Sequence, residues 1–239
     1  VSYFPNNGLL LYMLKTALIT GATGDIGREI AKTLSKKGFE LLLCGNKGEF
    51  DAQIKGAQLR FDVSDAKQVK KAFENIGKID LLVCCAGISE EEKLLIDTSD
   101  EDINKLVATN LLGTIYTIKY ALPHINRGGV IVNISSFLAR NGCSCEAVYS
   151  ATKGAIVSLT KSLAKECSAF GIRVNSISPG YIDTKMNSEF SQEEKNALIE
   201  KTPVGRFGKP SDVADGVVFL YENTFINGED ITISGGLEI

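Results

Sequence analysis

"KTALITGATGDIG", residues 15–27, is the stretch that decides the fold. Its first part, 15–20, is mostly apolar or β-branched, which is typical of a buried strand. Over 25–37 apolar side chains recur at helical spacing, with charged ones on the opposite face. The turn between them carries three glycines, Gly21, Gly24 and Gly27. Glycines permit a tight turn and let backbone N–H groups approach a pyrophosphate at the helix N-terminus, so the stretch predicts a dinucleotide-binding strand–turn–helix unit.

The rest of the chain repeats this alternation of short apolar runs and longer amphipathic ones. Further strands are expected at 39–44, 57–63, 79–85, 129–135, 172–178 and 229–234. Helices are expected at 65–76, 99–122, 147–169 and 211–221. Strands that each precede a helix predict an α/β fold, a doubly wound (Rossmann-type) parallel sheet with helices on both faces. No linker or repeat divides residues 13–239, which we expect to form a single domain, and residues 1–12 are interpreted as a leader or a cloning remnant.

Composition narrows the classes of function. The net charge of −3 gives no indication of nucleic-acid binding. No apolar run approaches the ~18 residues of a membrane span. The six cysteines lack the spacing of a zinc site, so no metal is predicted. Without a secretory signal, we interpret them as reduced thiols of a cytoplasmic protein, and we expect no disulfide between Cys44 and Cys84, because the first strand should lie between their strands.

A tyrosine and a lysine four residues apart occur in "AVYSATKGA" (147–155). On a helix, Tyr149 and Lys153 share one face, so the ammonium is expected to lower the pKa of the phenol and make it a general acid. The same spacing occurs in Tyr181 and Lys185, but these follow Pro179-Gly180 in an irregular stretch, where helical spacing does not apply. Tyr149 is therefore the favoured acid.

Several motifs, in this order, resemble the short-chain dehydrogenase/reductase family from Lys15 to the chain end. They are the glycine turn, "FDVSD" (61–65), "NLLG" (110–113), "VNISS" (132–136), the Tyr149–Lys153 pair, "SPG" (178–180), "RFGKPSDVA" (206–214) and "INGEDITISGG" (226–236). Within this family, the chain most resembles the 3-oxoacyl-[acyl-carrier-protein] reductases. The resemblance implies an NAD(P)-dependent enzyme that reduces a ketone to a secondary alcohol, or catalyses the reverse reaction.

The resemblance also implies the residues of the site. The catalytic residues would be Tyr149 as acid, Ser136 as hydrogen-bond partner of the substrate oxygen, Lys153, which also binds the nicotinamide ribose, and Asn110, which holds a proton-relaying water. The implied cofactor-binding residues are Gly21, Thr23, Gly24, Asp25, Ile26, Gly27, Asn46, Lys47, Asp62, Val63, Ala86, Gly87, Tyr149, Lys153, Pro179, Gly180, Ile182 and Thr184.

The sequence departs from the family pattern at two places. Asp25 stands where the single-domain reductases have the middle glycine of the turn, and we expect it to be an N-cap that turns away from the ligand. Cys84 and Cys85 replace two asparagines, of which the first usually braces the sheet. The following Ala86-Gly87, which lets the backbone pass close to the cofactor, is kept.

The cofactor and the partners are predicted less directly. No acid that would bind a ribose follows the second strand and Lys47 could pair with a 2′-phosphate, so NADP(H) is preferred over NAD(H). The preferred substrate is a 3-oxoacyl thioester. Acyl carrier protein is a possible partner, because Arg127 stands at a position where the resembled reductases carry a basic residue for this acidic protein. A sugar alcohol, a steroid or another small alcohol stays open, as do a nucleotide-sugar epimerase and a non-catalytic dinucleotide-binding regulator. A homotetramer is expected, with helices 99–122 and 147–169 at one interface.

Overall fold

A seven-stranded parallel sheet forms the centre of the computed structural model, which describes residues 15–188 and 190–237. The strand order is β3-β2-β1-β4-β5-β6-β7. The strands are β1 (Thr16–Thr20), β2 (Glu40–Gly45), β3 (Ala57–Arg60), β4 (Ile79–Cys84), β5 (Ile125–Ile134), β6 (Arg173–Pro179) and β7 (Asp230–Ile233). The sequence-based prediction of a doubly wound parallel sheet is confirmed. The predicted leader, residues 1–12, lies outside the described residues.

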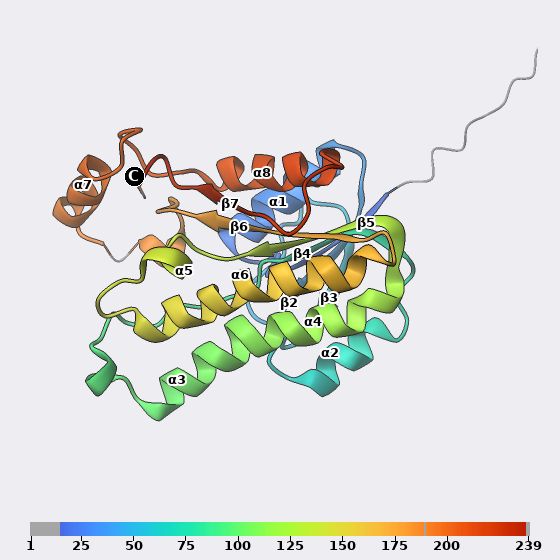
Figure 1. Cartoon of the computed structure of the whole chain (residues 1–239), viewed down its shortest axis with the longest axis horizontal. Helices are drawn as coiled ribbons and strands as arrows, with labels where there is room; N and C mark the ends of the chain where they lie inside the picture. The colour runs from blue at the N-terminus through green and yellow to red at the C-terminus, as the bar shows by residue number, and fades with distance from the viewer. Residues whose placement is uncertain (1–14, 189, 238–239) are drawn as a thin grey trace, which may run out of the picture.

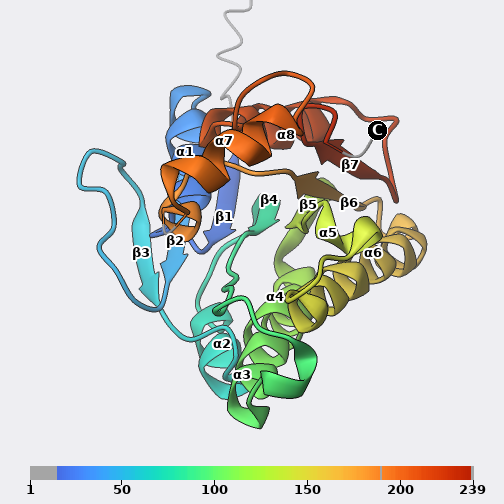
Figure 2. The same cartoon turned by 90° about the vertical axis from the view of Figure 1, so that its left-hand side faces the viewer.

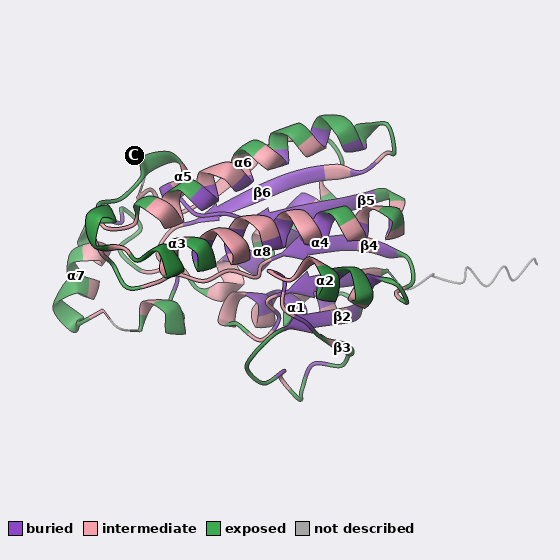
Figure 3. Ribbon diagram, turned by 90° about the horizontal axis from the view of Figure 1, so that it is seen from below, coloured by how far each residue is buried: buried purple, intermediate pink, exposed green. Residues whose placement is uncertain are grey.

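Helices cover both faces of the sheet (Figures 1 and 2). One face carries α1 (Asp25–Lys36) and α8 (Pro210–Glu222), and the other carries α2 (Ala66–Phe73), α4 (Gly113–Ala121) and α6 (Ala147–Ser168). The strands are buried between these two layers, as the purple ribbons in Figure 3 show. Two apolar cores result, and both include side chains of β1, β4 and β5. None of the helices in the described part of the chain is long and apolar enough to cross a membrane.

The order of the strands determines where a ligand can bind. The chain winds outward from β1 to β3 in one direction and from β4 to β7 in the other. A crevice therefore opens at the carboxyl ends of β1 and β4, where ligands of open α/β sheets bind. The carboxyl ends face the side on which α5 (Leu138–Asn141) and α7 (Gln192–Glu200) lie (Figure 1).

The structure differs from the predicted elements most clearly at one strand, at one helix and at two short helices that were not predicted. The strand predicted over 57–63 stops at Arg60, because the Asp62 carboxylate accepts a hydrogen bond from the Ser64 amide at 2.9 Å and closes a turn. The helix predicted over 99–122 is divided into α3 (Asp100–Leu106), a π-helical segment (Val107–Leu112) and α4. Two short helices, α5 and α7, were not predicted; both lie in loops at the carboxyl side of the sheet.

The position of β1 also decides the question about Cys44 and Cys84. Thr20 of β1 is in register with Cys44 on one side and with Cys84 on the other. Two strand spacings of ~4.8 Å separate the cysteines, which is more than the ~7 Å that a disulfide spans between Cα atoms. Both thiols are free and buried, and they pack in the same apolar core.

Candidate active site

One cavity of about 1270 Å³ lies along the carboxyl ends of the strands. This volume exceeds the ~300–1,000 Å³ of a typical small-molecule pocket, so it can accept a dinucleotide together with a substrate. Every residue that the sequence implied as cofactor-binding lines this cavity, and so does Ser136. Asn110 is the exception, because it is buried behind the lining.

The glycine turn forms one end of the cavity. Gly21 has φ +68°, and a Cβ atom there would lie 2.8 Å from the backbone nitrogen of Ala86, so only glycine fits. Gly24 is the N-cap of α1 and makes no side-chain capping bond. The first residues of the helix line the cavity, so the unpaired N–H groups and the partial positive charge of the helix N-terminus lie at its edge. This cradle fits the pyrophosphate of a dinucleotide.

Asp25 does not occupy the place that the sequence suggested. The N-cap is Gly24, and Asp25 is the first residue of α1. Its carboxylate lines the cavity and accepts a hydrogen bond from the backbone N–H of Lys185 at 2.7 Å. The expectation that Asp25 is the N-cap is therefore wrong, because the carboxylate finds its donor in the loop after β6 instead of in its own helix.

The residues after β2 and β3 that were predicted to bind the cofactor form hydrogen bonds with one another and with their neighbours. The Asn46 amide donates to the Asp62 carboxylate at 2.7 Å, and the Thr23 hydroxyl donates to the Lys47 carbonyl at 2.8 Å. Arg60 donates to the Gly48 carbonyl at 2.6 Å and so braces the same turn. These bonds leave the Lys47 ammonium as the cation in this part of the lining.

Asn110 holds the strand end that passes the cavity. Its amide nitrogen donates to the Ile88 carbonyl at 2.9 Å, and its amide oxygen accepts from the Ile88 N–H at 2.8 Å. It lies in the π-helical segment, and such segments are frequent at functional sites. A Cβ atom on Gly87 would lie 3.3 Å from Asn110 Oδ1 and 3.4 Å from Lys153 Nζ, so Gly87 lets the backbone come close to both groups.

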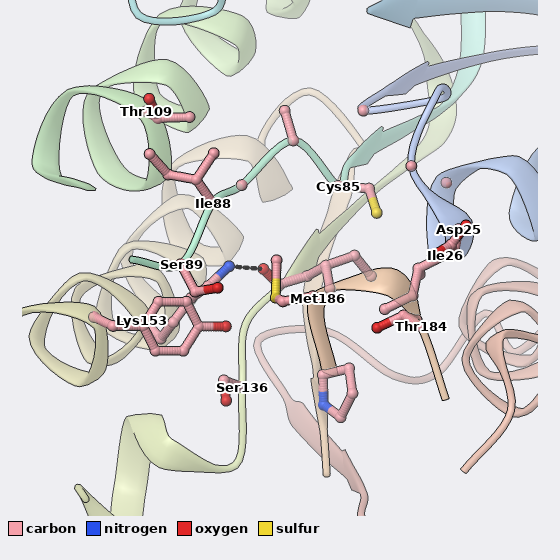
Figure 4. Close-up of a pocket in the computed structure, with 18 of the residues that line it drawn as sticks. Asp25, Ile26, Cys85, Ile88, Ser89, Thr109, Ser136, Lys153, Thr184 and Met186 are labelled. Carbon is pink, nitrogen blue, oxygen red and sulfur yellow. Dashed lines mark hydrogen bonds between the residues drawn. The ribbon is translucent and has the colours of Figure 1, made fainter. Parts of the chain in front are cut away.

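Ser136, Tyr149 and Lys153 meet at the other end of the cavity. The Ser136 hydroxyl, at the end of β5, accepts from the Leu138 N–H at 3.2 Å and forms a hydrogen bond with the Tyr149 phenol. Lys153 is one helical turn after Tyr149 in α6, and its Nζ lies 5.6 Å from the centre of the Tyr149 ring. Figure 4 shows the bond that Nζ donates to the Ile134 carbonyl at 3.1 Å.

The proton affinities of this group differ from the sequence-based expectation. Burial raises the pKa of Tyr149 to about 12, although its hydrogen bond with Ser136 acts in the opposite direction. Burial also lowers the pKa of Lys153 to about 8. The expectation that Lys153 lowers the pKa of Tyr149 is wrong for this structure, because Nζ is directed to the Ile134 carbonyl and desolvation dominates at both groups.

Aromatic and acidic side chains line the substrate end of the cavity. The Tyr181 ring stacks on Phe207, 5.8 Å between ring centres, and makes edge contacts with Phe137 and Phe190. Tyr181 is thus part of a wall. Glu146 lies three residues before Tyr149, and burial together with the nearby Glu92 raises its pKa to about 7. Glu146 was not predicted from the sequence, although its position three residues before Tyr149 could have indicated that it lies near the site.

A second missed group supports the Ser136 loop from behind. The Asp230 carboxylate accepts from the hydroxyl groups of Ser176 at 2.7 Å and Ser178 at 2.9 Å, and it pairs with Arg140 at 2.9 Å. Arg140 lies in α5, whose first N–H donates to Ser136. No short motif reveals this pair, because the two residues lie 90 positions apart.

Comparisons with known proteins agree with this geometry. Residues 21–238 match the family model described as Enoyl-(Acyl carrier protein) reductase. The chain is 38% identical to carbonyl reductase family member 4 of Xenopus laevis, over 95% of this chain and 99% of the relative. It is 35% identical to the human 3-oxoacyl-[acyl-carrier-protein] reductase, over 95% and 99%. A solved Brucella melitensis structure, named a short-chain dehydrogenase/reductase and glucose/ribitol dehydrogenase, is similar with a TM-score of 0.89 and 36% identity, over 94% and 97%.

Proposed function

The chain belongs to the short-chain dehydrogenase/reductase family, and on this premise we propose that it is an NADPH-dependent reductase of 3-oxoacyl thioesters. Membership establishes an NAD(P)-dependent oxidoreductase that interconverts a ketone and a secondary alcohol. The observation that carries the proposal is the convergence of Ser136, Tyr149 and Lys153 in the cavity that also contains the glycine turn. The reductase names of the relatives favour hydride transfer over epimerisation or silent dinucleotide binding.

The nicotinamide, when bound, supplies the hydride for reduction or accepts it for oxidation. The protein itself must supply or accept the proton. With a pKa of about 12, the Tyr149 phenol carries its proton near neutral pH and can give it to the carbonyl oxygen. The Ser136 hydroxyl, oriented by the Leu138 N–H, is placed to stabilise the charge that develops on this oxygen.

Lys153 then stabilises the tyrosinate that remains after proton transfer. Its Nζ is close enough to the Tyr149 ring for this, and at about pH 7 it is largely protonated, because its pKa is about 8. Asn110 does not line the cavity. Its amide binds the Ile88 backbone and so fixes the segment after β4 that passes the proposed nicotinamide site. We propose this role for Asn110 in addition to the water that the resemblance implies.

The proposed substrate rests on the relatives' names and on the shape of the cavity. Phe137, Tyr181 and Phe190 give its substrate end an apolar wall that suits an acyl chain. Arg127 does not support docking of a carrier protein at this mouth, because it lies at the start of β5, at the opposite end of that strand to Ser136. Oxidation of a sugar alcohol is the second candidate, favoured by Glu92 and Glu146 in the lining, since carboxylates accept hydrogen bonds from hydroxyl groups.

A substrate panel separates these candidates. Loss of reduced-nicotinamide absorbance would be measured with a free 3-oxoacyl thioester, the same group on acyl carrier protein, and simple ketones. Gain of absorbance would be measured with sugar alcohols and oxidised cofactor. Turnover of a 3-oxoacyl thioester at least tenfold faster in kcat/KM than of any sugar alcohol is the expected result. The reverse order would replace the first candidate with the second.

The remaining proposals concern the cofactor, the assembly and the location. NADP(H) preference is supported by Lys47 in the lining and by the engagement of Asp62 with Asn46. A homotetramer is supported by large apolar side chains on the surface, of which Phe225 is fully exposed and Phe219 half exposed, and by β7 at the edge of the sheet. A cytoplasmic location is supported by the six free thiols.

A further inference from the structure

Asp25 makes a hydrogen bond that joins two segments of the cavity lining. Its Oδ2 atom accepts from the backbone N–H of Lys185 at 2.7 Å, although the two residues are 160 positions apart. Asp25 belongs to the glycine turn, and Lys185 follows Thr184 in the loop after β6. Both residues line the cavity. Among the described residues, no basic side chain forms an ion pair with Asp25.

The segment that Asp25 holds is otherwise bonded mainly to itself. Within 184–188, the Asn187 N–H donates to the Thr184 carbonyl at 3.0 Å and the Ser188 N–H to the Lys185 carbonyl at 3.1 Å. The Asn187 amide adds a bond to the Ile182 carbonyl at 2.7 Å. These contacts make a compact turn but do not attach it to the glycine turn. The Asp25 carboxylate provides that attachment, and a hydrogen bond to an ionised acceptor is stronger than one between neutral groups.

The turn lines the cavity with residues 184–187. In Figure 4, Asp25, Ile26 and Thr184 lie at one end of the view, Lys153 and Ser136 at the other, and Met186 between them. Met186 is half exposed and lines the cavity. The position of this turn therefore affects the space in which a substrate can meet the nicotinamide.

The same carboxylate stands beside the cradle for a pyrophosphate. Gly24 and Ile26, its neighbours in the turn, line the cavity with it. A carboxylate in the first turn of a helix interacts well with the helix dipole, but it repels another anion that binds there. The family pattern has a glycine at this position, and a glycine would provide neither the hydrogen bond to Lys185 nor the repulsion of an anion.

We propose that Asp25 is a positioning residue that latches segment 184–188 onto the cofactor-binding turn, at the expense of affinity for the cofactor pyrophosphate. The latch itself needs only the hydrogen bond to Lys185. The effect on affinity rests on the proposed function, because it requires a dinucleotide. The departure of Asp25 from the family pattern thus obtains a physical role.

Two substitutions separate the bond from the charge. Asp25→Asn removes the charge and keeps an acceptor oxygen, whereas Asp25→Ala removes both. Glu29→Ala is the matched control, because Glu29 carries the same charge on the same helix but does not line the cavity. Hydrogen exchange of the peptide that contains Lys185 would be followed in the cofactor-free protein. Exchange should be fastest in Asp25→Ala, slightly faster than parental in Asp25→Asn, because a neutral acceptor is weaker than a carboxylate, and parental in Glu29→Ala.

Binding of NADPH, measured by titration of cofactor fluorescence, tests the second part. Asp25→Asn should bind about three- to tenfold more tightly at low salt, and the gain should shrink at high salt. In Asp25→Ala, the KM for the ketone should rise more than kcat falls.

Parental exchange in Asp25→Ala would overturn the latch, and parental NADPH affinity in Asp25→Asn would overturn the effect on affinity. If Asp25→Ala does not fold, faster exchange in Asp25→Asn than in Glu29→Ala supports the latch, because the neutral acceptor is weaker, and equal exchange overturns it. Failure of the wild type to bind NADPH or to reduce any ketone would instead refute the proposed function, while the exchange result still decides the latch.

Discussion

Replacing Lys153 with methionine should make the protein more stable at about pH 7 and abolish turnover. Lys153 is only 6% exposed, and burial lowers its pKa from 10.5 to about 8. At ~1.4 kcal/mol per pKa unit, this shift means that the folded state is less stable by about 3 kcal/mol when the lysine is charged. Methionine has a similar length, no charge and an adaptable shape, so it should remove this cost without a large cavity.

One hydrogen bond opposes the gain. Lys153 Nζ donates to the Ile134 carbonyl at 3.1 Å, and methionine leaves this carbonyl without that donor. An unsatisfied buried polar group costs about 1–3 kcal/mol, so a net stabilisation of up to about 2 kcal/mol remains. In a chain of this size, such a gain raises the Tm by up to about 8 °C.

The sign of the pH dependence provides the decisive check. Between the folded pKa of about 8 and the unfolded value of 10.5, the unfolded chain holds more protons than the folded one, so wild-type stability rises with pH over this window. The advantage of Lys153→Met should therefore fade between about pH 7 and about pH 10. Urea unfolding at both values measures it, with Lys161→Met, an exposed position of the same helix, as control. A variant that is less stable than wild type at about pH 7, or a difference independent of pH, would refute the reasoning.

Further outcomes follow from the same site. Tyr149→Phe should lose about 10²–10⁴-fold in kcat with a ketone substrate, whereas Tyr181→Phe should stay within a few-fold, and the opposite pattern would contradict the assignment of the acid. The kcat/KM of ketone reduction, followed against pH, should fall above about pH 8 as Lys153 loses its proton; a profile flat to pH 10 would argue against this role. Lys47→Ala should weaken binding of NADPH but not of NADH in parallel titrations, and equal losses would remove Lys47 as the determinant. Light scattering at micromolar concentration should give the mass of a tetramer, and a monomer would be incompatible with the proposed assembly.

The alternation of strands and helices followed from the sequence because strand and helix patterns are local. The glycine turn identified the first strand and helix, and the expected crossover placed β1 between β2 and β4. The cavity lining was predictable for a related reason. In a parallel sheet, all the strand ends that carry motifs meet at one edge, so residues far apart in the sequence converge there. Every predicted cofactor-binding residue lies on that edge.

Features that depend on contacts between distant segments were not predictable. The helix expected over 99–122 is interrupted because the Asn110 side chain binds the Ile88 backbone, and helical periodicity contains no trace of this contact. The partner of Asp25 is a backbone N–H 160 positions away, and any residue type could supply it. Arg140 and Asp230 are 90 positions apart in the chain, and an isolated arginine or aspartate usually lies in solvent.

The spacing of Tyr149 and Lys153 indicated proximity, but proximity alone does not determine proton affinity. An ammonium lowers the pKa of a phenol only if it is charged and acts on the oxygen, and both conditions depend on burial. Here the apolar strands of the sheet desolvate both groups, so the phenol becomes a weaker acid and the ammonium a stronger one. Desolvation thus causes both pKa shifts, and each pKa lies further from the value of the free side chain than it would without burial. A protein that needs a charged lysine at this position must therefore offset its desolvation, and the hydrogen bond that Nζ donates to the Ile134 carbonyl at 3.1 Å is a contact among the described residues that does so.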